Sequence, residues 1–243
     1  MMQVPGQICP VLSPWGKAGG GGRPPPAGPG PAGNKPDSGQ PRRAYHHGRL
    51  KEALIEAARA LIERHGPQGF TLSEAAKLAG VTTAAPYRHF TDRDALMGEV
   101  ATRGFEQFGA RLAGAWDEGR PDAIAALQRI GRAYLAFARD EPGFYFTMFG
   151  HSQRLSEQGS IAAEKSFNSL ANAAAAVLRE RNAPISGARS LAYEIWAASH
   201  GVATLGLGRF LEPDKPESDP VRVLDSAVSA LIERAVWVAG RGT

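Results

Sequence analysis

Apolar residues recur at helical spacing along most of the chain, and no stretch alternates between apolar and polar positions as a half-buried strand would. Between residues 48 and 65 they follow the i, i+4, i+7, i+8 pattern of an amphipathic helix, which Gly66 and Pro67 end. We therefore expect an all-α fold of about nine helices. Comparable stripes downstream predict helices over residues 92–116, 121–138, 156–181, 188–210 and 221–238.

Residues 71–90 carry the most informative local pattern, which predicts two short helices joined by a tight turn. Thr71 and Glu74 form a T-x-x-E capping box at the start of the first of these helices. Gly80 follows that helix at the position where the backbone needs a positive φ, which glycine adopts without strain. The second helix follows the turn and is expected to end at Phe90.

Two interpretations of this pair of helices are open. Two helices that cross steeply over a short glycine turn form a helix-turn-helix, whose second helix can enter the major groove of DNA. The alternative is an ordinary helical hairpin within a bundle. Under either interpretation, the second helix is capped by Thr82 or by Thr83.

The charge of the chain is modest but unevenly distributed. There are 28 basic and 24 acidic residues, which give a formal net charge of +4. Residues 1–45 carry +4, residues 46–91 carry +2, and the remainder carries −2. Contact with DNA or another polyanion would therefore involve the N-terminal third. From charge alone, a purely solubilising role remains an equal alternative.

The N-terminal segment has a composition that opposes regular structure. Residues 1–41 contain ten prolines and ten glycines, so we expect a disordered tail that extends to residue 44. Arg42 and Arg43 lie where this tail joins the first helix. A basic arm at this point can follow the phosphates or enter the minor groove of DNA, and a plain linker is the alternative.

Cysteine content and hydropathy argue for a soluble cytoplasmic protein. Cys9 is the sole cysteine, so neither a disulfide within one chain nor a cysteine-based metal site can form. No apolar run approaches the ~20 residues of a membrane span. Pro5, Pro10 and Pro14 interrupt the region in which a secretion signal would need a continuous apolar segment.

Local enzyme motifs are absent from the sequence. It contains no G-x-x-x-x-G-K-[ST], H-E-x-x-H or G-x-S-x-G pattern. His46 and His47 could bind a metal, but a solvated or phosphate-facing pair explains them more simply. We expect no catalytic residue, no metal site and no cofactor, although catalytic residues can also lie far apart in a sequence.

In a helix-turn-helix, the side chains of residues 71–93 would divide into two roles. Residues at the start of the second helix reach base edges, where hydroxyl and methyl groups can read acceptors and thymine methyls. Tyr87 as a partly buried core residue is a serious alternative to DNA contact. The candidate base contacts are Thr82, Thr83, Ala84, Ala85 and Arg88, and the candidate phosphate contacts are Arg42, Arg43, Arg49, Thr71, Tyr87, His89 and Arg93.

Residues Tyr45–Val100 contain the run G-V-T…Y-R-H-F-x-x-[KR]-[DE]-x-L, and this segment resembles the N-terminal domain of the TetR family of bacterial transcription regulators. Trp196, His200 and Gly201 form a W-x-x-x-H-G pattern that resembles the subgroup with a so-called WHG C-terminal domain. The resemblance implies an all-α dimer, in which a three-helix DNA-binding domain is joined by a fourth helix to a ligand-binding and dimerisation domain. It thus implies a DNA-binding domain at 45–107 and a C-terminal domain at 108–243.

Two residues depart from the family pattern in the second helix of the motif. Pro86 stands where the family usually has Leu, Ile or Phe, and Ala84 stands where Gly is frequent. If Thr82 caps the helix, Pro86 removes one helical hydrogen bond, whereas with Thr83 as the cap nothing is lost. Proline also disfavours helical geometry at Ala85. The base-reading geometry is the property that these departures affect.

The resemblance also implies a mechanism and a set of partners. The expected protein is a homodimeric repressor that binds a palindromic operator in double-stranded DNA and is released by a small hydrophobic or aromatic effector. Each candidate pocket residue could instead pack in the hydrophobic core without contacting a ligand. The candidates are Trp116, Tyr134, Phe137, Phe144, Tyr145, Met148, Phe149, Phe167, Trp196 and His200.

The last two predicted helices share an i, i+4, i+7, i+11, i+14 stripe, which could form a four-helix interface between two subunits or could face the subunit's own core. Two other classes of protein remain as rivals to a ligand-responsive regulator. One is an architectural DNA-binding protein without an effector, and the other is a small α-helical enzyme.

Overall fold

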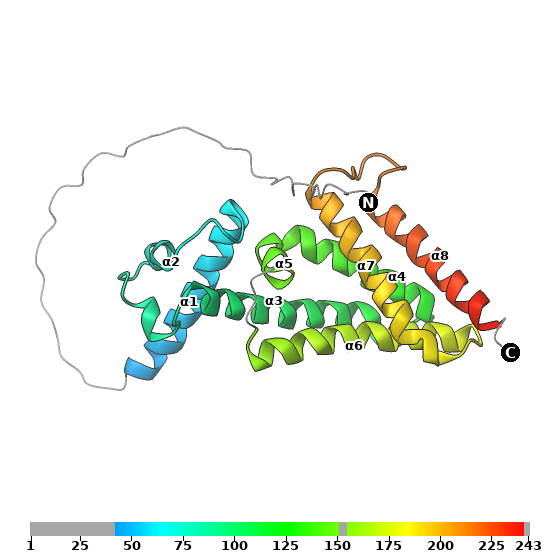
Figure 1. Ribbon diagram of the computed structural model, residues 1–243, viewed down its shortest axis with the longest axis horizontal. Helices are drawn as coiled ribbons and strands as arrows, with labels where there is room; N and C mark the ends of the chain where they lie inside the picture. Colours follow the sequence, from blue (N-terminus) through cyan, green and yellow to red (C-terminus); the bar gives the residue numbers. More distant parts are fainter. Residues whose placement is uncertain (1–41, 151–154, 241–243) are drawn as a thin grey trace, which may run out of the picture.

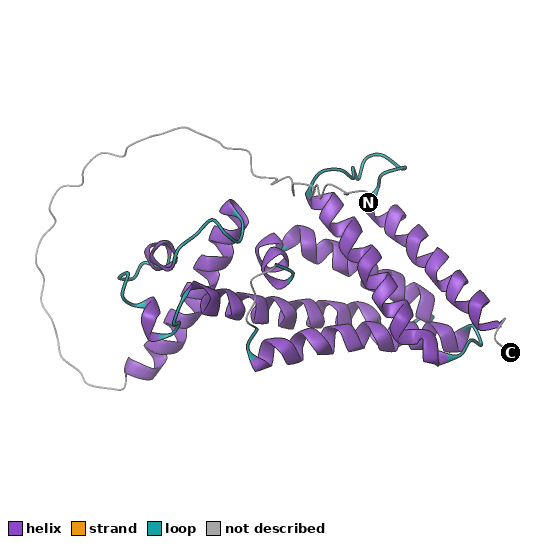
Figure 2. Cartoon of the chain, in the orientation of Figure 1, coloured by secondary structure: helices purple, strands orange, loops and turns teal. Residues whose placement is uncertain are grey.

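A computed structural model of the chain describes residues 42–150 and 155–240. Within these ranges it has eight α-helices, three short 3-10 helices and no strand, which confirms the all-α prediction (Figure 2). None of these helices combines the length and apolar character that a membrane span requires. The α-helices are α1 (Arg42–His65), α2 (Leu72–Leu78), α3 (Arg93–Trp116), α4 (Ala123–Asp140), α5 (Pro142–Met148), α6 (Glu157–Glu180), α7 (Ala188–Leu207) and α8 (Pro220–Gly240).

Helix α1 begins six residues before the predicted start at Gly48. The segment from Arg42 to His47, which we expected to be an arm or a linker, is helical instead. Arginine and alanine favour helix, and one interior glycine costs only about 1 kcal/mol, so Gly48 does not stop the helix. The expected tail over residues 1–44 otherwise lies outside the described residues.

The helices divide into a small end and a larger bundle that share α3. Figure 1 shows α1 and α2 at one end, with α3 running from them into the bundle alongside α6. Helices α4, α7 and α8 complete the bundle, and α5 packs against both α1 and α3. The N-terminal end and the bundle are therefore joined by a continuous helix and by α5.

Helix α2 begins and ends as its sequence predicts. The Thr71 hydroxyl accepts from the Glu74 N–H at 3.2 Å, and the Glu74 carboxylate accepts from the Thr71 N–H at 2.8 Å. After the helix, Gly80 has φ +72°. The Val81 N–H donates to the carbonyl of Ala76, five residues earlier, at 3.0 Å. This 6→1 hydrogen bond defines a Schellman motif.

Helices α3, α4, α6, α7 and α8 begin within two residues of their predicted starts, and the capping residue of α3 differs from the one that its sequence suggests. The sequence Thr91-Asp92-Arg93-Asp94 also fits the pattern of a capping box, with Thr91 as the capping residue. Asp92 is the N-cap instead, and its carboxylate accepts from the Ala95 N–H at 2.8 Å. A carboxylate is an effective N-cap, because it satisfies an amide that the first turn leaves free.

The apolar stripes of α7 and α8 face the interior of their own subunit over most of their length. Leu191, Ile195 and Val202 of α7 are buried, as are Leu224 and Val228 of α8. The core was the alternative to a subunit interface, and the packing decides for it at these positions. Leu205 and Val238, the last residues of the two stripes, are exposed.

The turn after α2 gives a direct test of backbone strain. We expect Gly80→Ala to lower the free energy of unfolding by about 1–2 kcal/mol, because a Cβ there meets no atom within 4 Å and only the positive φ opposes it. Gly114→Ala, in the exposed interior of α3, is the matched control and should raise stability by about 0.5–1 kcal/mol. Urea denaturation of both variants measures the difference, and equal effects would show that Gly80 is not under this constraint.

Candidate nucleic-acid interface and interior cavity

The second helix of the predicted motif is much shorter than its sequence suggests. Only Pro86–Arg88 is helical, as the 3-10 helix η1, instead of a helix from Thr82 or Thr83 to Phe90. Proline has no N–H, so it cannot donate to the Thr82 carbonyl, which instead accepts from the Ala85 N–H at 3.0 Å in a tight turn.

Neither threonine caps this helix. Ala85 occupies the N-cap position, and no side chain bonds to the first turn. The helix therefore begins after Ala85, and neither of the two expected capping residues is used. The helix-turn-helix keeps its first helix and its turn, but its second helix is reduced to about one turn.

The candidate base contacts nevertheless lie together on the surface. Thr82, Thr83, Ala84 and Arg88 are exposed, and Ala85 is half-buried. Pro86 is fully buried and anchors the segment from below. The turn and η1 therefore present a short row of small, hydroxyl and cationic groups to solvent.

The candidate phosphate contacts are less uniform. Arg49 and Thr71 are exposed, and the Tyr87 side chain is 60% exposed, which excludes the alternative of a core tyrosine. His89 is half-buried beside the Phe90 ring, at 6.3 Å between ring centroids. Arg42 and Arg43 lie on α1, and their side chains are outside the described part of the structure.

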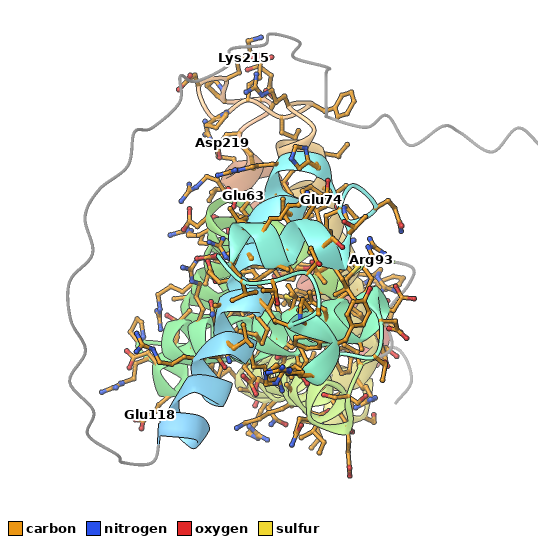
Figure 3. The ribbon with its side chains drawn as sticks, turned by 90° about the vertical axis from the view of Figure 1, so that its left-hand side faces the viewer. Glu63, Glu74, Arg93, Glu118, Lys215 and Asp219 are labelled. Carbon is orange, nitrogen blue, oxygen red and sulfur yellow. The ribbon has the colours of Figure 1, made fainter. Side chains whose placement is uncertain are left out.

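Arg93 is engaged in contacts within the protein. Its guanidinium donates to the carbonyls of Phe70, at 3.1 Å, and of Pro67, and lies 4.9 Å from the centroid of the Phe70 ring. It also pairs with Asp94 at 3.4 Å. Figure 3 looks onto this end of the molecule and labels Arg93 and Glu74 on it. These contacts tie the start of α3 to the turn before α2, which is a structural role.

The bundle contains a cavity of about 220 Å³ between α3, α4, α5, α6, α7 and α8. Five of the ten candidate pocket residues line it, from four different helices. Because these residues are far apart in the sequence, only the packing of the bundle brings them together. They are Tyr134, Met148, Phe149, Phe167 and Trp196.

The other five candidates are not among the residues that line the cavity. The Phe137 ring packs edge-on against Phe108, at 5.2 Å between centroids. Phe144 lies under the Arg59 guanidinium, 5.5 Å away, and Trp116 is half-buried at the end of α3. The remaining two, Tyr145 and His200, form a polar cluster.

Several lining residues were not recognised in the sequence. Some come from the apolar faces of α3 and α8, and others are polar side chains of α4, α6, α7 and α8, which an apolar pattern does not mark. Periodicity identifies the inward face of a helix, but it cannot show where inward faces fail to meet. The unrecognised residues include Phe105, Phe108, Leu112, Gln128, Ser166, Ser199, Leu224, Asp225 and Val228.

His200 is held by two tyrosines next to the cavity. Its Nδ1 lies 2.9 Å from the Tyr145 hydroxyl and 3.2 Å from the Tyr134 hydroxyl. Burial lowers the pKa of His200 and raises the pKa of both tyrosines, so all three are neutral near pH 7. No group of three or more potential metal ligands occurs among the described residues.

Helix α5 contacts the cavity with one end and α1 with the other. Met148 lines the cavity. At the opposite end, a Cβ added to Gly143 would lie 2.7 Å from the Arg59 carbonyl oxygen, so the two helices are in very close contact. The Arg59 guanidinium pairs with Glu141 at 3.4 Å. A displacement of α5 at the cavity would therefore reach the helix that carries the N-terminal end.

Two family models match separate regions of the chain. Residues 54–100 match the model described as bacterial regulatory proteins, tetR family, and residues 127–231 match the model described as tetracyclin repressor-like, C-terminal domain. The first region contains α2, η1 and the turn between them. The second contains most of the cavity wall. Together the two regions cover more than half of the chain.

Individual relatives agree with these matches. The chain is 26% identical over 98 residues to the uncharacterised HTH-type transcriptional regulator YobS from Bacillus subtilis strain 168, which is 40% of this chain and about half (50%) of the relative's length. A solved structure of a protein with unknown function from Rhodococcus sp. RHA1 has a TM-score of 0.67 at 28% identity and covers 80% of this chain and 100% of its own. A TetR family transcription regulator from Marinobacter aquaeolei VT8 shares the fold, with a TM-score of 0.57 at 16% identity over 76% of this chain and 97% of its own.

The polar cluster predicts how stability depends on pH. Because the pKa of His200 is below its usual value of 6.5, the unfolded chain binds a proton at this residue at a higher pH than the folded chain. Its stabilisation is fully present above pH 6.5 and is lost as the pH falls through the folded-state pKa. Denaturation between pH 7.5 and roughly pH 5 should show a smaller loss of stability for His200→Gln than for the unchanged chain. The exposed His65→Gln is the control, and an unchanged slope for His200→Gln would contradict the assignment.

Proposed function

The chain belongs to the TetR family of transcription regulators, and from this premise we propose that it is a sequence-specific repressor. In this proposal it binds a palindromic operator as a homodimer in the cytoplasm and leaves it when a small molecule occupies the cavity. Regulators of this family are DNA-binding transcription factors and not enzymes. The small α-helical enzyme is therefore no longer a rival interpretation.

The observation that carries the proposal is the exposed row formed by the turn after α2 and by η1. Thr82, Thr83 and Ala84 would face the bases, and Arg88 would reach a base edge or a phosphate from the next turn. Tyr87 would donate its hydroxyl to a phosphate. Because the helical part is so short, one copy would read only a few bases, and two copies would be needed for affinity.

Dimerisation is proposed to use the outward faces of α7 and α8. On α7, Ala197, Gly201 and Thr204 are exposed at helical spacing, next to the exposed Leu205. On α8, the Trp237 side chain is 57% exposed. Small residues on one face allow two helices to approach closely, and the apolar side chains beside them supply area to bury.

The proposed domain organisation makes α3 the element that both functions share. A DNA-binding domain over residues 45–107 and a ligand-binding and dimerisation domain over residues 108–243 would meet within this continuous helix. Tilting α3, or moving α5 against α1, would change the distance between the two DNA-binding ends. Two half-sites of DNA require a separation of about 34–36 Å, so a small change would weaken binding.

The direct test is a gel-shift titration with the DNA that flanks the protein's own gene. We expect binding to one palindromic segment that is at least roughly 1,000-fold tighter than binding to random DNA of equal length at the same salt concentration. Sedimentation of the protein at micromolar concentration should give a dimer. Equal affinity for both DNAs would support an architectural protein instead, and a monomer would remove the paired-site mechanism.

Two arginine variants separate DNA contact from stability. Arg88→Ala should weaken operator binding by roughly 10-fold or more while leaving the unfolding midpoint unchanged, since this side chain is exposed. Arg93→Ala should lower the free energy of unfolding by about 1–3 kcal/mol, because two backbone carbonyls lose their donor. The assignment of Arg88 fails if its variant binds the operator as tightly as the unchanged protein.

A third variant tests whether α5 transmits to α1. Gly143→Ala would push α5 away from α1, since the new Cβ would meet the Arg59 carbonyl oxygen. We expect operator affinity to change by about fivefold or more, although Gly143 is far from the DNA-facing row in sequence and on another helix. Gly187→Ala, where a Cβ meets nothing within 4 Å, is the matched control and should bind as the unchanged protein does. Unchanged affinity for Gly143→Ala would exclude this route.

A further inference from the structure

The wall of the interior cavity restricts the size and shape of what it can hold. Its volume is about 220 Å³, and aromatic rings from α3, α4, α6 and α7 and from the residue after α5 surround it, among them Phe108, Tyr134, Phe149, Phe167 and Trp196. An apolar cavity of about 150 Å³ is large enough for benzene. The space here therefore suits a flat molecule of about two fused rings, which can contact the aromatic walls face-on and edge-on.

The wall offers nothing that could neutralise an anion. Among the described residues that line the cavity, none is lysine, arginine or histidine. Asp225 is the one carboxylate among them, and its charge is already paired with Arg132 at 3.0 Å. A bound carboxylate or phosphate would lose its water without gaining a partner, which is strongly unfavourable.

The hydroxyl groups of the wall are mostly acceptors towards a ligand. Ser166 donates its proton to the Ala162 carbonyl at 2.9 Å, and Ser199 donates to the Ile195 carbonyl at 2.8 Å. Their oxygen lone pairs remain able to accept a hydrogen bond. The Asp225 carboxylate is likewise an acceptor, and the Gln128 amide can act in either sense.

We propose that the effector is an uncharged aromatic compound of about two fused rings that carries a hydrogen-bond donor, of the phenol or indole class. This inference rests on the proposed ligand-responsive function and specifies the chemistry of its site. The rings would fill the space between the aromatic walls. The donor would bond to a serine oxygen or to the side chain of Gln128 or Asp225.

Three probes with one ring system test the inference by calorimetric titration of the full-length protein. They are 2-naphthol, which is uncharged and has a donor, naphthalene, which lacks the donor, and 2-naphthoate, which carries a charge. We expect 2-naphthol to bind about 5-fold or more tighter than naphthalene, and at least roughly 100-fold tighter than 2-naphthoate. Binding of 2-naphthoate as tight as that of 2-naphthol would overturn the inference, as would equal binding of naphthalene.

Two substitutions of alanine by leucine test whether the probe binds in the cavity. Ala163 of α6 lines the cavity, so Ala163→Leu would occupy part of the volume and should weaken 2-naphthol binding by about 10-fold or more. Ala175→Leu, a half-buried position on the same helix outside the cavity wall, should leave the affinity within about twofold. Circular dichroism checks that both variants are folded. Equal affinities in two folded variants would show that the probe binds elsewhere.

The test of ligand binding and the test of operator binding can fail independently of each other. Calorimetry measures the probe without DNA, and the gel shift measures the operator without the probe. Tight binding of 2-naphthol to a protein with no operator preference would support the ligand chemistry and contradict the proposed function. A specific operator together with the failure of 2-naphthol to bind would do the reverse.

Discussion

The close packing of α5 against its neighbours is the contact on which the rest of the molecule depends. A Cβ added at Gly104 of α3 would lie 2.7 Å from the Met148 sulfur, and one added at Gly143 would lie as close to the backbone of α1. Packed interiors resist compression, so a helix held this tightly on two sides moves its neighbours when it moves. The cavity wall and the N-terminal end therefore both contact α5.

Pro86 imposes the second constraint, because it determines the shape of the exposed row that the turn after α2 and η1 form. Its missing N–H leaves the Thr82 carbonyl to a tight turn, and its buried ring anchors that turn to the N-terminal core. The result is a short 3-10 helix that still exposes Tyr87 and Arg88. A three-residue helix presents few side chains, which makes pairing of two copies the natural source of affinity in the proposed mechanism.

The cavity and the polar cluster beside it show how the bundle separates apolar from polar contacts. His200 satisfies its Nδ1 with tyrosine hydroxyls, so the imidazole stays neutral and outside the cavity wall. The serines of the wall donate to their own helices. Because these hydroxyl groups already donate within the protein and the imidazole is neutral, the cavity can bind an uncharged ligand without leaving a buried charge unpaired.

Local chemistry in the sequence determined the all-α class, most helix limits, the capping box of Thr71 and the turn at Gly80, because each depends on residues a few positions apart. The motif around residues 71–90 also indicated the family. Tertiary structure alone decided which aromatics line the cavity, that Leu224 and Val228 face inward, and that Arg93 bonds to the turn before α2. Helical periodicity marks a buried face, but which other helix meets it, and whether the two faces leave a space, depends on contacts between distant parts of the chain.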